Sequence, residues 1–332
     1  MKILIAGLGS IGRRHLRNLI ALGEEDIVLY RSHRSSLPDE ELKDFPVETD
    51  FEAALAHRPQ AVIISNPTAL HLEVAIPAAL AGCHILMEKP VSHSLEHIDI
   101  LVNAVDKSGS RILIGYQFRF HPGLQQIKKL LDEGIIGKPY SAHAHWGEYL
   151  PGWHPWEDYR HSYSARSELG GGVILTLSHP LDYLRWLLGE VDMVGAFAER
   201  LGDLELNVED TAEIGLKFNS GLLASLHLDY NQRPFAHTLE IFGTQGFLRW
   251  DNSDGKVALC RSTSDSWEYF PVPAGFERNT LFLDELSHFI RVARNEESPV
   301  CSLEDGIETL RVCLAALKSA QQGRVISMSE VQ

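Results

Sequence analysis

A glycine-rich turn near the start of the chain constrains the fold most. "MKILIAGLGSIGRRHLRNL" begins with an apolar run typical of a β-strand, passes through Gly7, Gly9 and Gly12, and continues with helical spacing. In a strand-turn-helix unit the first glycine permits a tight turn, the second lets a pyrophosphate approach, and the third lets helix and strand pack closely. Glycine turns also occur for purely structural reasons, but this position favours dinucleotide binding. The predicted contacts are Gly7, Gly9, Ser10, Ile11 and Gly12.

The end of the second predicted strand indicates which dinucleotide binds. An acidic residue there would accept hydrogen bonds from a ribose 2′-hydroxyl. After "DIVLYR" this chain instead has Arg31, Ser32 and Arg34, which offer cations and a hydroxyl to a 2′-phosphate. We therefore predict NADP(H) in preference to NAD(H). The alternative is a solvated basic turn.

Further strand-helix units follow over 61–81, 84–109 and 111–120. Their alternation predicts a doubly wound parallel sheet with right-handed crossovers, in an α/β fold. Ligands bind at the carboxyl ends of such strands. Beside a cationic nicotinamide, a desolvated lysine has a lowered pKa and can exchange a proton with a substrate hydroxyl. The residues expected around this crevice are Ser65, Asn66, Pro67, Glu88, Lys89, Pro90, Tyr116, Gln117 and Arg119.

The rhythm changes after about residue 120. Strand patterns linked by turns occur at 140–149, 192–200, 211–218, 221–230 and 237–251, and helical patterns at 122–133, 280–295 and 303–322. This order predicts a mostly antiparallel sheet. We expect two domains, a dinucleotide-binding domain over 1–119 and a substrate-binding α/β domain over 120–332.

An aromatic segment in the second domain suggests a substrate class. "HWGEYLPGWHPWEDYRHSYSAR" mixes tryptophans with hydrogen-bonding and charged groups, as sites for sugars do. Trp153, Tyr159 and Arg160 are predicted substrate contacts, and the other predicted substrate contacts are Lys89, Arg119, Thr176 and His179. The alternative is a packed loop or a subunit interface. His143 and His145 alternate on one strand face, but no carboxylate or cysteine stands nearby at ligand spacing, so no metal site is predicted.

"GGGVILTLSHPLDYL" contains the second candidate for catalysis. A glycine triplet, which would allow close approach of a substrate or nicotinamide, precedes a helical pattern on which Thr176 and His179 share one face. Pro180 removes a helical hydrogen bond, so we expect a bend at His179. The alternative role for His179 is a core histidine tied to Asp182.

Composition sets the remaining limits. The chain has 332 residues, 44% of them hydrophobic, and this length favours two domains. A net charge of −15 argues against nucleic-acid or membrane partners, which leaves small molecules. The four cysteines form no CxxC pair, the apolar runs are too short to span a bilayer, and a strand pattern starts at Lys2. We expect a soluble cytoplasmic protein.

Together, "GLGSIG" at 7–12, "NPTALH" at 66–71, "EKP" at 88–90 and the triplet with His179 resemble the Gfo/Idh/MocA family (glucose-fructose oxidoreductase, inositol dehydrogenase and MocA). The resemblance implies a Rossmann domain followed by an α/β domain whose open, mostly antiparallel sheet packs subunits, hence a homo-oligomer, a dimer or tetramer. It also implies NAD(P)-dependent oxidation or reduction at a carbon bearing oxygen in a carbohydrate. Lys89 and His179 would be the catalytic acid/base residues and His71 a cofactor contact.

One position departs from the family pattern. An aspartate often follows the glycine triplet by four residues in the family, and this chain has Thr176 there. Threonine cannot act as a base near neutral pH, so any role of that carboxylate is either absent or supplied by Asp182 or Glu148. Two alternatives to hydride transfer stay open: redox-neutral glycoside cleavage with a tightly held NAD(P), and a catalytically inactive dinucleotide sensor.

Overall fold

The computed structural model describes residues 1–31, 40–264 and 266–331. The chain divides into two compact units, and the division is not a single cut. Unit 1 comprises Met1–Gln117 and Glu277–Ile307, and unit 2 comprises Phe118–Phe276 and Glu308–Gln332. The segment 277–307 thus follows most of unit 2 in the chain but packs within unit 1.

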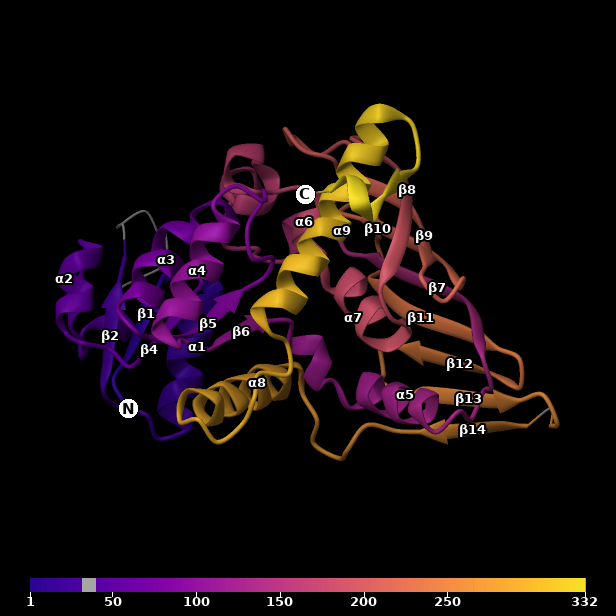
Figure 1. The fold of residues 1–332 in the computed structure, drawn as a ribbon, viewed down its shortest axis with the longest axis horizontal. Helices are drawn as coiled ribbons and strands as arrows, with labels where there is room; N and C mark the ends of the chain where they lie inside the picture. Colours follow the sequence, from indigo (N-terminus) through magenta and orange to yellow (C-terminus); the bar gives the residue numbers. More distant parts are fainter. Residues whose placement is uncertain (32–39, 265, 332) are drawn as a thin grey trace. The chain divides into compact units, whose positions relative to one another are not determined.

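Unit 1 contains a six-stranded parallel sheet of order β3-β2-β1-β4-β5-β6 (Figure 1). Its central strands are buried on both faces, which explains their continuous apolar runs. The order reverses direction between β1 and β4, and at such a switch point ligands bind in doubly wound sheets. The strands are β1 (Ile3–Ala6), β2 (Ile27–Tyr30), β3 (Val47–Glu48), β4 (Ala61–Ile64), β5 (His84–Glu88) and β6 (Ile112–Gly115).

The helices of unit 1 cover this sheet. Right-handed crossovers place helices on both faces of such a sheet, and α1 packs against α8 while α3 packs against α4. The bounds are α1 (Ser10–Ala21), α2 (Phe51–Ala56), α3 (His71–Leu80), α4 (Ile98–Ser108) and α8 (Arg278–Ala293).

Unit 2 contains a nine-stranded sheet of order β14-β13-β12-β11-β7-β10-β9-β8-β15. All its strand pairs are antiparallel except β7 with β10. The two sheets confirm the predicted fold class. The strands are β7 (Pro139–Gly147), β8 (Val191–Glu199), β9 (Thr211–Phe218), β10 (Leu223–Asp229), β11 (Ala236–Gly243), β12 (Gly246–Asp251), β13 (Val257–Arg261), β14 (Trp267–Phe270) and β15 (Ile326–Ser327).

One face of this second sheet forms the core of unit 2. In β9 the residues alternate, with Ile214 and Leu216 buried and Glu213 and Lys217 exposed. The buried face packs against helices, as an antiparallel sheet with one solvated face requires. The helices are α5 (Pro122–Asp132), α6 (Val173–Thr176), α7 (His179–Leu188) and α9 (Leu303–Gln322), whose first turn belongs to unit 1.

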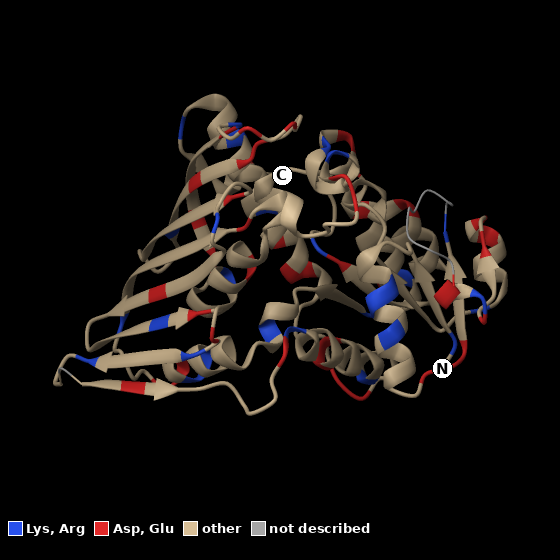
Figure 2. Ribbon diagram, turned by 180° about the vertical axis from the view of Figure 1, so that it is seen from behind, with Lys and Arg blue, Asp and Glu red and all other residues tan. Residues whose placement is uncertain are grey.

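Charged residues occur on the helices and strands of both units (Figure 2). The cysteines Cys83, Cys260, Cys301 and Cys313 are thiols rather than disulfides. None of the helices in the described ranges combines the length and the apolar character that a membrane span needs.

Candidate active site

The glycine turn between β1 and α1 has the geometry of a dinucleotide site. A Cβ at Gly7, where φ is 96°, would lie 2.5 Å from the backbone nitrogen of Asn66, and a Cβ at Gly12 would lie 1.9 Å from the carbonyl oxygen of Gly7. Gly9, by contrast, faces open space with nothing within 4 Å. Gly7 and Gly12 are therefore required for packing, while Gly9 leaves room for a pyrophosphate at the start of α1.

The loops after β1, β4 and β5 are tied to one another. The Ser65 hydroxyl donates to the carbonyl of Gly7 at 2.9 Å. The two ring nitrogens of His71 lie 2.9 Å from the carbonyl of Pro90 and 3.0 Å from that of Asn66. Burial lowers the pKa of His71, so the ring is neutral at physiological pH. The structure thus brings the "NPTALH" and "EKP" segments together, and His71 lies between them.

The side chain of Asn66 has a buried oxygen that could accept a hydrogen bond from a dinucleotide. The side-chain nitrogen of Asn66 donates to the carbonyl of Leu70 at 3.0 Å. Its side-chain oxygen is buried and accepts no hydrogen bond from the described residues. Buried polar atoms are almost always hydrogen-bonded in folded proteins. This oxygen beside the glycine turn is therefore suited to accept a hydrogen bond from a bound dinucleotide.

Glu88 ends β5, and its carboxylate is held by a histidine of α1. The ring of His15 lies 2.8 Å from a carboxylate oxygen of Glu88. Burial alone would raise the pKa of Glu88, but the hydrogen bond with His15 and the nearby charges of His15 and Lys89 outweigh it, so the pKa is lowered. The ionised carboxylate lies close enough to influence Lys89, which is half-buried in the same turn.

Two other predicted cofactor regions are placed only in part. Arg31 is buried at the end of β2, and its backbone N–H donates to the carbonyl of Glu48. The predicted contacts Ser32 and Arg34 lie outside the described residues. Gln117 is buried where β6 leads into a short 3₁₀-helix.

In unit 2, Arg119 and Asp182 form a buried ion pair. The guanidinium donates to both carboxylate oxygens, at 2.7 and 3.0 Å, and the two side chains are 4% and 1% exposed. Asp182 Oδ1 also lies 3.5 Å from the hydroxyl of Thr309. Asp182 therefore neutralises a buried arginine.

His179 begins α7 and lies among aromatic rings. Phe118 approaches it edge-on with ring centroids 5.1 Å apart, and Trp146 stacks on it at 5.6 Å. The expected bend is a full break: α6 ends at Thr176 and α7 begins at His179. Pro180 lies in the first turn of α7, where the missing N–H costs nothing.

The aromatic segment leaves β7 and forms three short 3₁₀-helices, Leu150–Gly152, Tyr159–His161 and Tyr163–Ala165. Trp153 packs edge-on against Tyr230. The guanidinium of Arg160 is exposed and pairs with Asp158 and Glu205, and the Tyr159 hydroxyl accepts a hydrogen bond from the backbone of Glu205. Arg160 and Tyr159 thus brace this segment against the chain near residue 205.

Glu209, whose carboxylate lies against Gly172 of the glycine triplet, was missed by sequence reasoning. A Cβ at Gly172 would lie 2.4 Å from its carboxylate oxygen, and this oxygen accepts a hydrogen bond from the backbone of Ile174 at 3.2 Å. Gly172 therefore accommodates a protein carboxylate. Burial raises the pKa of Glu209 to about 7, and the charge of Asp210 adds to this effect. The acidic pair at 209–210, directly before a strand, was the available signal.

Glu148, the other carboxylate considered in place of the family aspartate, has a different partner. The indole N–H of Trp146 donates to it at 3.3 Å. Thr176 is buried, and its side chain lies close enough to Tyr230 to influence the phenol. The side chains of Thr176, Tyr230 and Glu209 thus surround the exit from the triplet.

Unit 1 is a doubly wound dinucleotide-binding domain, and the comparison with known families agrees with this class. Residues 1–116 match the oxidoreductase family with an NAD-binding Rossmann fold, and residues 124–249 match the Gfo/Idh/MocA C-terminal domain. The chain belongs to the Gfo/Idh/MocA family of NAD(P)-dependent oxidoreductases.

Relatives cover nearly the whole chain. A 1,5-anhydro-D-fructose reductase from Ensifer adhaerens is 31% identical over 80% of this chain and 78% of its own. The myo-inositol 2-dehydrogenase of Thermotoga maritima is 29% identical over 100% of this chain and 99% of its own. A levoglucosan dehydrogenase solved in complex with NADH shares the fold, with a TM-score of 0.86 at 20% identity over 99% of both chains.

Proposed function

We propose that this chain is an NADP(H)-preferring oxidoreductase. It transfers a hydride to or from a secondary alcohol or ketone carbon of a sugar, a sugar acid or a nucleotide-sugar-like substrate. The observation that carries the proposal is the glycine turn, in which Gly9 faces open space while the loops at 65–67 and 88–90 are tied together beside it. The names of the relatives, which include a sugar reductase and an inositol dehydrogenase, support the substrate class.

Lys89 and His179 have the acid/base roles in this proposal. The dinucleotide, when bound, supplies hydride chemistry at its nicotinamide ring. Lys89 follows a strand of the dinucleotide-binding sheet, directly after the ionised Glu88. It would give a proton to, or take one from, the substrate hydroxyl. His179, enclosed by Phe118 and Trp146, would hold or move a proton in the substrate domain.

The preference for NADP(H) rests on the end of β2. Arg31 stands where an acidic residue would select NAD(H), and its side chain is buried beside the sheet. Ser32 and Arg34 would complete a pocket for a 2′-phosphate.

Steady-state kinetics with a panel of sugars, sugar acids and nucleotide sugars tests the proposal. We expect turnover that changes NADPH absorbance, with a higher kcat/KM for NADP(H) than for NAD(H). A higher kcat/KM for NAD(H) would overturn the cofactor preference alone. A cofactor that stays bound through purification, with turnover but no net change in absorbance, would indicate redox-neutral cleavage instead.

Lys89→Ala tests the catalytic assignment. Loss of a general acid/base typically costs 10²–10⁴-fold in rate, so we expect kcat to fall by about that factor while NADPH still binds. Lys107→Ala, at an exposed lysine near the end of α4, is the matched control and should keep full activity. Near-normal turnover of Lys89→Ala would refute the role of this residue.

A further inference from the structure

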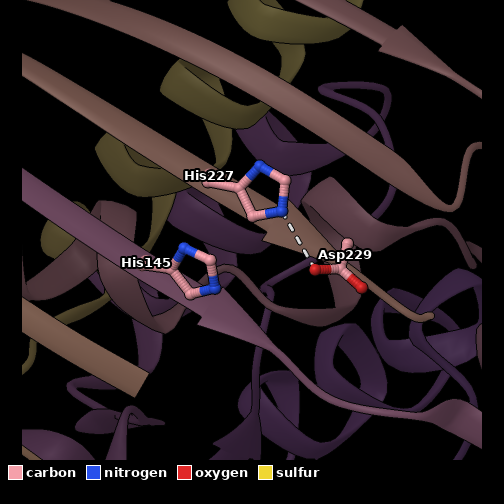
Figure 3. Close-up of side chains that lie close together, drawn as sticks. All are labelled: His145, His227 and Asp229. Atoms are coloured by element: carbon pink, nitrogen blue, oxygen red, sulfur yellow. Dashed lines mark hydrogen bonds and ion pairs between the residues drawn. The ribbon is translucent and has the colours of Figure 1, made fainter. Parts of the chain in front are cut away.

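Three side chains with metal-binding groups lie together on the sheet of unit 2, outside the candidate active site. His145 comes from β7, and His227 and Asp229 come from β10 (Figure 3). One ligand atom from each lies within 4.8 Å of the others. In the sequence, only His143 stands near His145. The other two members of this group, His227 and Asp229, are about 80 residues further along the chain.

The strand register creates this group. His227 is paired directly with His145 across the parallel β7–β10 ladder, and Asp229 is paired with Gly147. Residues two apart on a strand share a face, so all three side chains project from the same face of the sheet. The adjacent residues Trp146 and Leu228 point into the core, which places the group on the face opposite the core.

Hydrogen bonds hold His227 and Asp229 in place. Nδ1 of His227 lies 2.6 Å from a carboxylate oxygen of Glu213, and Nε2 lies 2.9 Å from Oδ2 of Asp229. Oδ1 of Asp229 accepts the backbone N–H groups of Asn231 and Gln232, at 2.7 and 2.6 Å. Oδ2 is thereby aimed at the imidazole rings. Metal-binding histidines commonly donate their other ring N–H to a carboxylate in this way.

The lack of a side chain at Gly147 leaves room for the side chains of Gln232 and Asp229. A Cβ at this position would lie 2.0 Å from the side-chain oxygen of Gln232 and 2.5 Å from Oδ2 of Asp229. The same oxygen of Gln232 lies 2.5 Å from Nε2 of His145. The side-chain oxygen of Gln232 is thus a fourth candidate ligand beside the group, and a larger residue at 147 would displace it.

We propose that His145, His227 and Asp229 bind one divalent transition-metal ion, with zinc as the best match and Gln232 or water in the fourth position. Two imidazoles and a carboxylate suit zinc better than magnesium or calcium, which take oxygen ligands. Tetrahedral bonds of 2.0–2.1 Å separate ligand atoms by about 3.4 Å. The three ligand atoms, which lie within 4.8 Å of one another, would have to move closer together on binding. The ion would cross-link β7 and β10 at the middle of the sheet.

Binding of zinc to the untagged, chelator-treated full-length chain tests this proposal. We expect isothermal titration calorimetry to show one tight Zn²⁺ site per chain. We also expect Co²⁺ to give the intense visible absorption of a tetrahedral site. His145→Ala and Asp229→Asn should each weaken Zn²⁺ binding at least tenfold, and Glu213→Gln by about 10–100-fold, the usual cost of losing an outer carboxylate.

His143→Ala is the matched control, because the chain has 16 histidines that could bind zinc weakly. His143 stands two residues before His145 on the same strand, and its ring contacts the hydroxyl of Ser225 rather than the proposed ligands. This variant should bind Zn²⁺ as the wild type does. Circular dichroism shows whether each variant is folded, and Glu213→Gln supplies the test if His145→Ala does not fold.

Two results would overturn the proposal. One is the lack of a stoichiometric Zn²⁺ site in the wild-type chain. The group would then be a hydrogen-bonded cluster in which His227 bridges Glu213 and Asp229 without a metal. The other is equal Zn²⁺ affinity in His143→Ala and His145→Ala. Neither result bears on the proposed oxidoreductase activity, because the assay measures metal binding alone.

Discussion

Glu209 makes the stability of unit 2 depend on pH in a way that one substitution should remove. Its carboxyl is packed against Gly172, and burial raises its pKa from an ordinary 4.5 to about 7. The folded chain therefore binds this proton more tightly than the unfolded chain does. The stabilisation is fully present below about pH 4.5 and is lost as the pH rises through about 7.

The size of the effect follows from these two values. At 1.36 kcal/mol for each tenfold change in proton affinity, the difference between 4.5 and about 7 corresponds to about 3 kcal/mol. Glu209→Gln stays uncharged at every pH and can still accept the hydrogen bond from the backbone of Ile174. Relative to the wild type, the variant should therefore gain about 3 kcal/mol in free energy of unfolding between pH 4 and pH 8.

Denaturant unfolding followed by tryptophan fluorescence measures this gain. All six tryptophans, from Trp146 to Trp267, belong to unit 2, so the signal reports the unit that contains Glu209. Glu199→Gln, at an exposed position at the end of β8, is the matched control and should show no such trend. A Glu209→Gln variant whose stability difference from the wild type is constant from pH 4 to pH 8 would refute the reasoning.

Three further predictions follow from the packing. Gly12→Ala should lower NADPH affinity at least tenfold in a fluorescence titration, because its Cβ would lie 1.9 Å from the carbonyl of Gly7; unchanged affinity would contradict the role of this glycine. Arg119→Met and Asp182→Asn should each lower the free energy of unfolding by about 3–5 kcal/mol, because each leaves a buried charge unpaired. The double variant Arg119→Met/Asp182→Leu should cost less than either single variant. If the two costs simply add, the ion pair does not couple these residues. Burial and the charge of Glu88 raise the pKa of Glu285 well above its ordinary value. Glu285→Gln should therefore gain stability relative to the wild type as the pH rises. A thermal-shift series that shows no such gain would contradict the raised pKa of Glu285.

Local pattern was enough to predict most of the secondary structure. The strand-turn-helix unit at the start, the helices near 122–133, 280–295 and 303–322, and the strands between 140 and 251 occur where periodicity placed them. The strands β13 and β14 were not predicted. The short strands β3 and β15 were missed because two residues carry no periodic signal. The 3₁₀-helices after β7 were missed because an aromatic loop has no repeat from which to infer them.

Contacts between residues far apart in the chain could not be predicted from local sequence patterns. Asp182, 63 residues after Arg119, holds that arginine in a buried ion pair. Glu209 approaches Gly172 only because the chain returns to the triplet just before β9. Such partners depend on how strands and helices are ordered in space.

The sequence by itself determined the family, the fold class and the glycine turn, because a strand, a glycine spacing and a helix in immediate succession form one local unit with one geometry. Only the tertiary structure decided which charged groups are paired and which carboxylate faces the glycine triplet. The same is true of the proposed metal site, because the parallel register of β7 and β10 places His227 beside His145. Burial and strand register join residues far apart in the chain, and these contacts set the charge state and the ligand-binding capacity of each group.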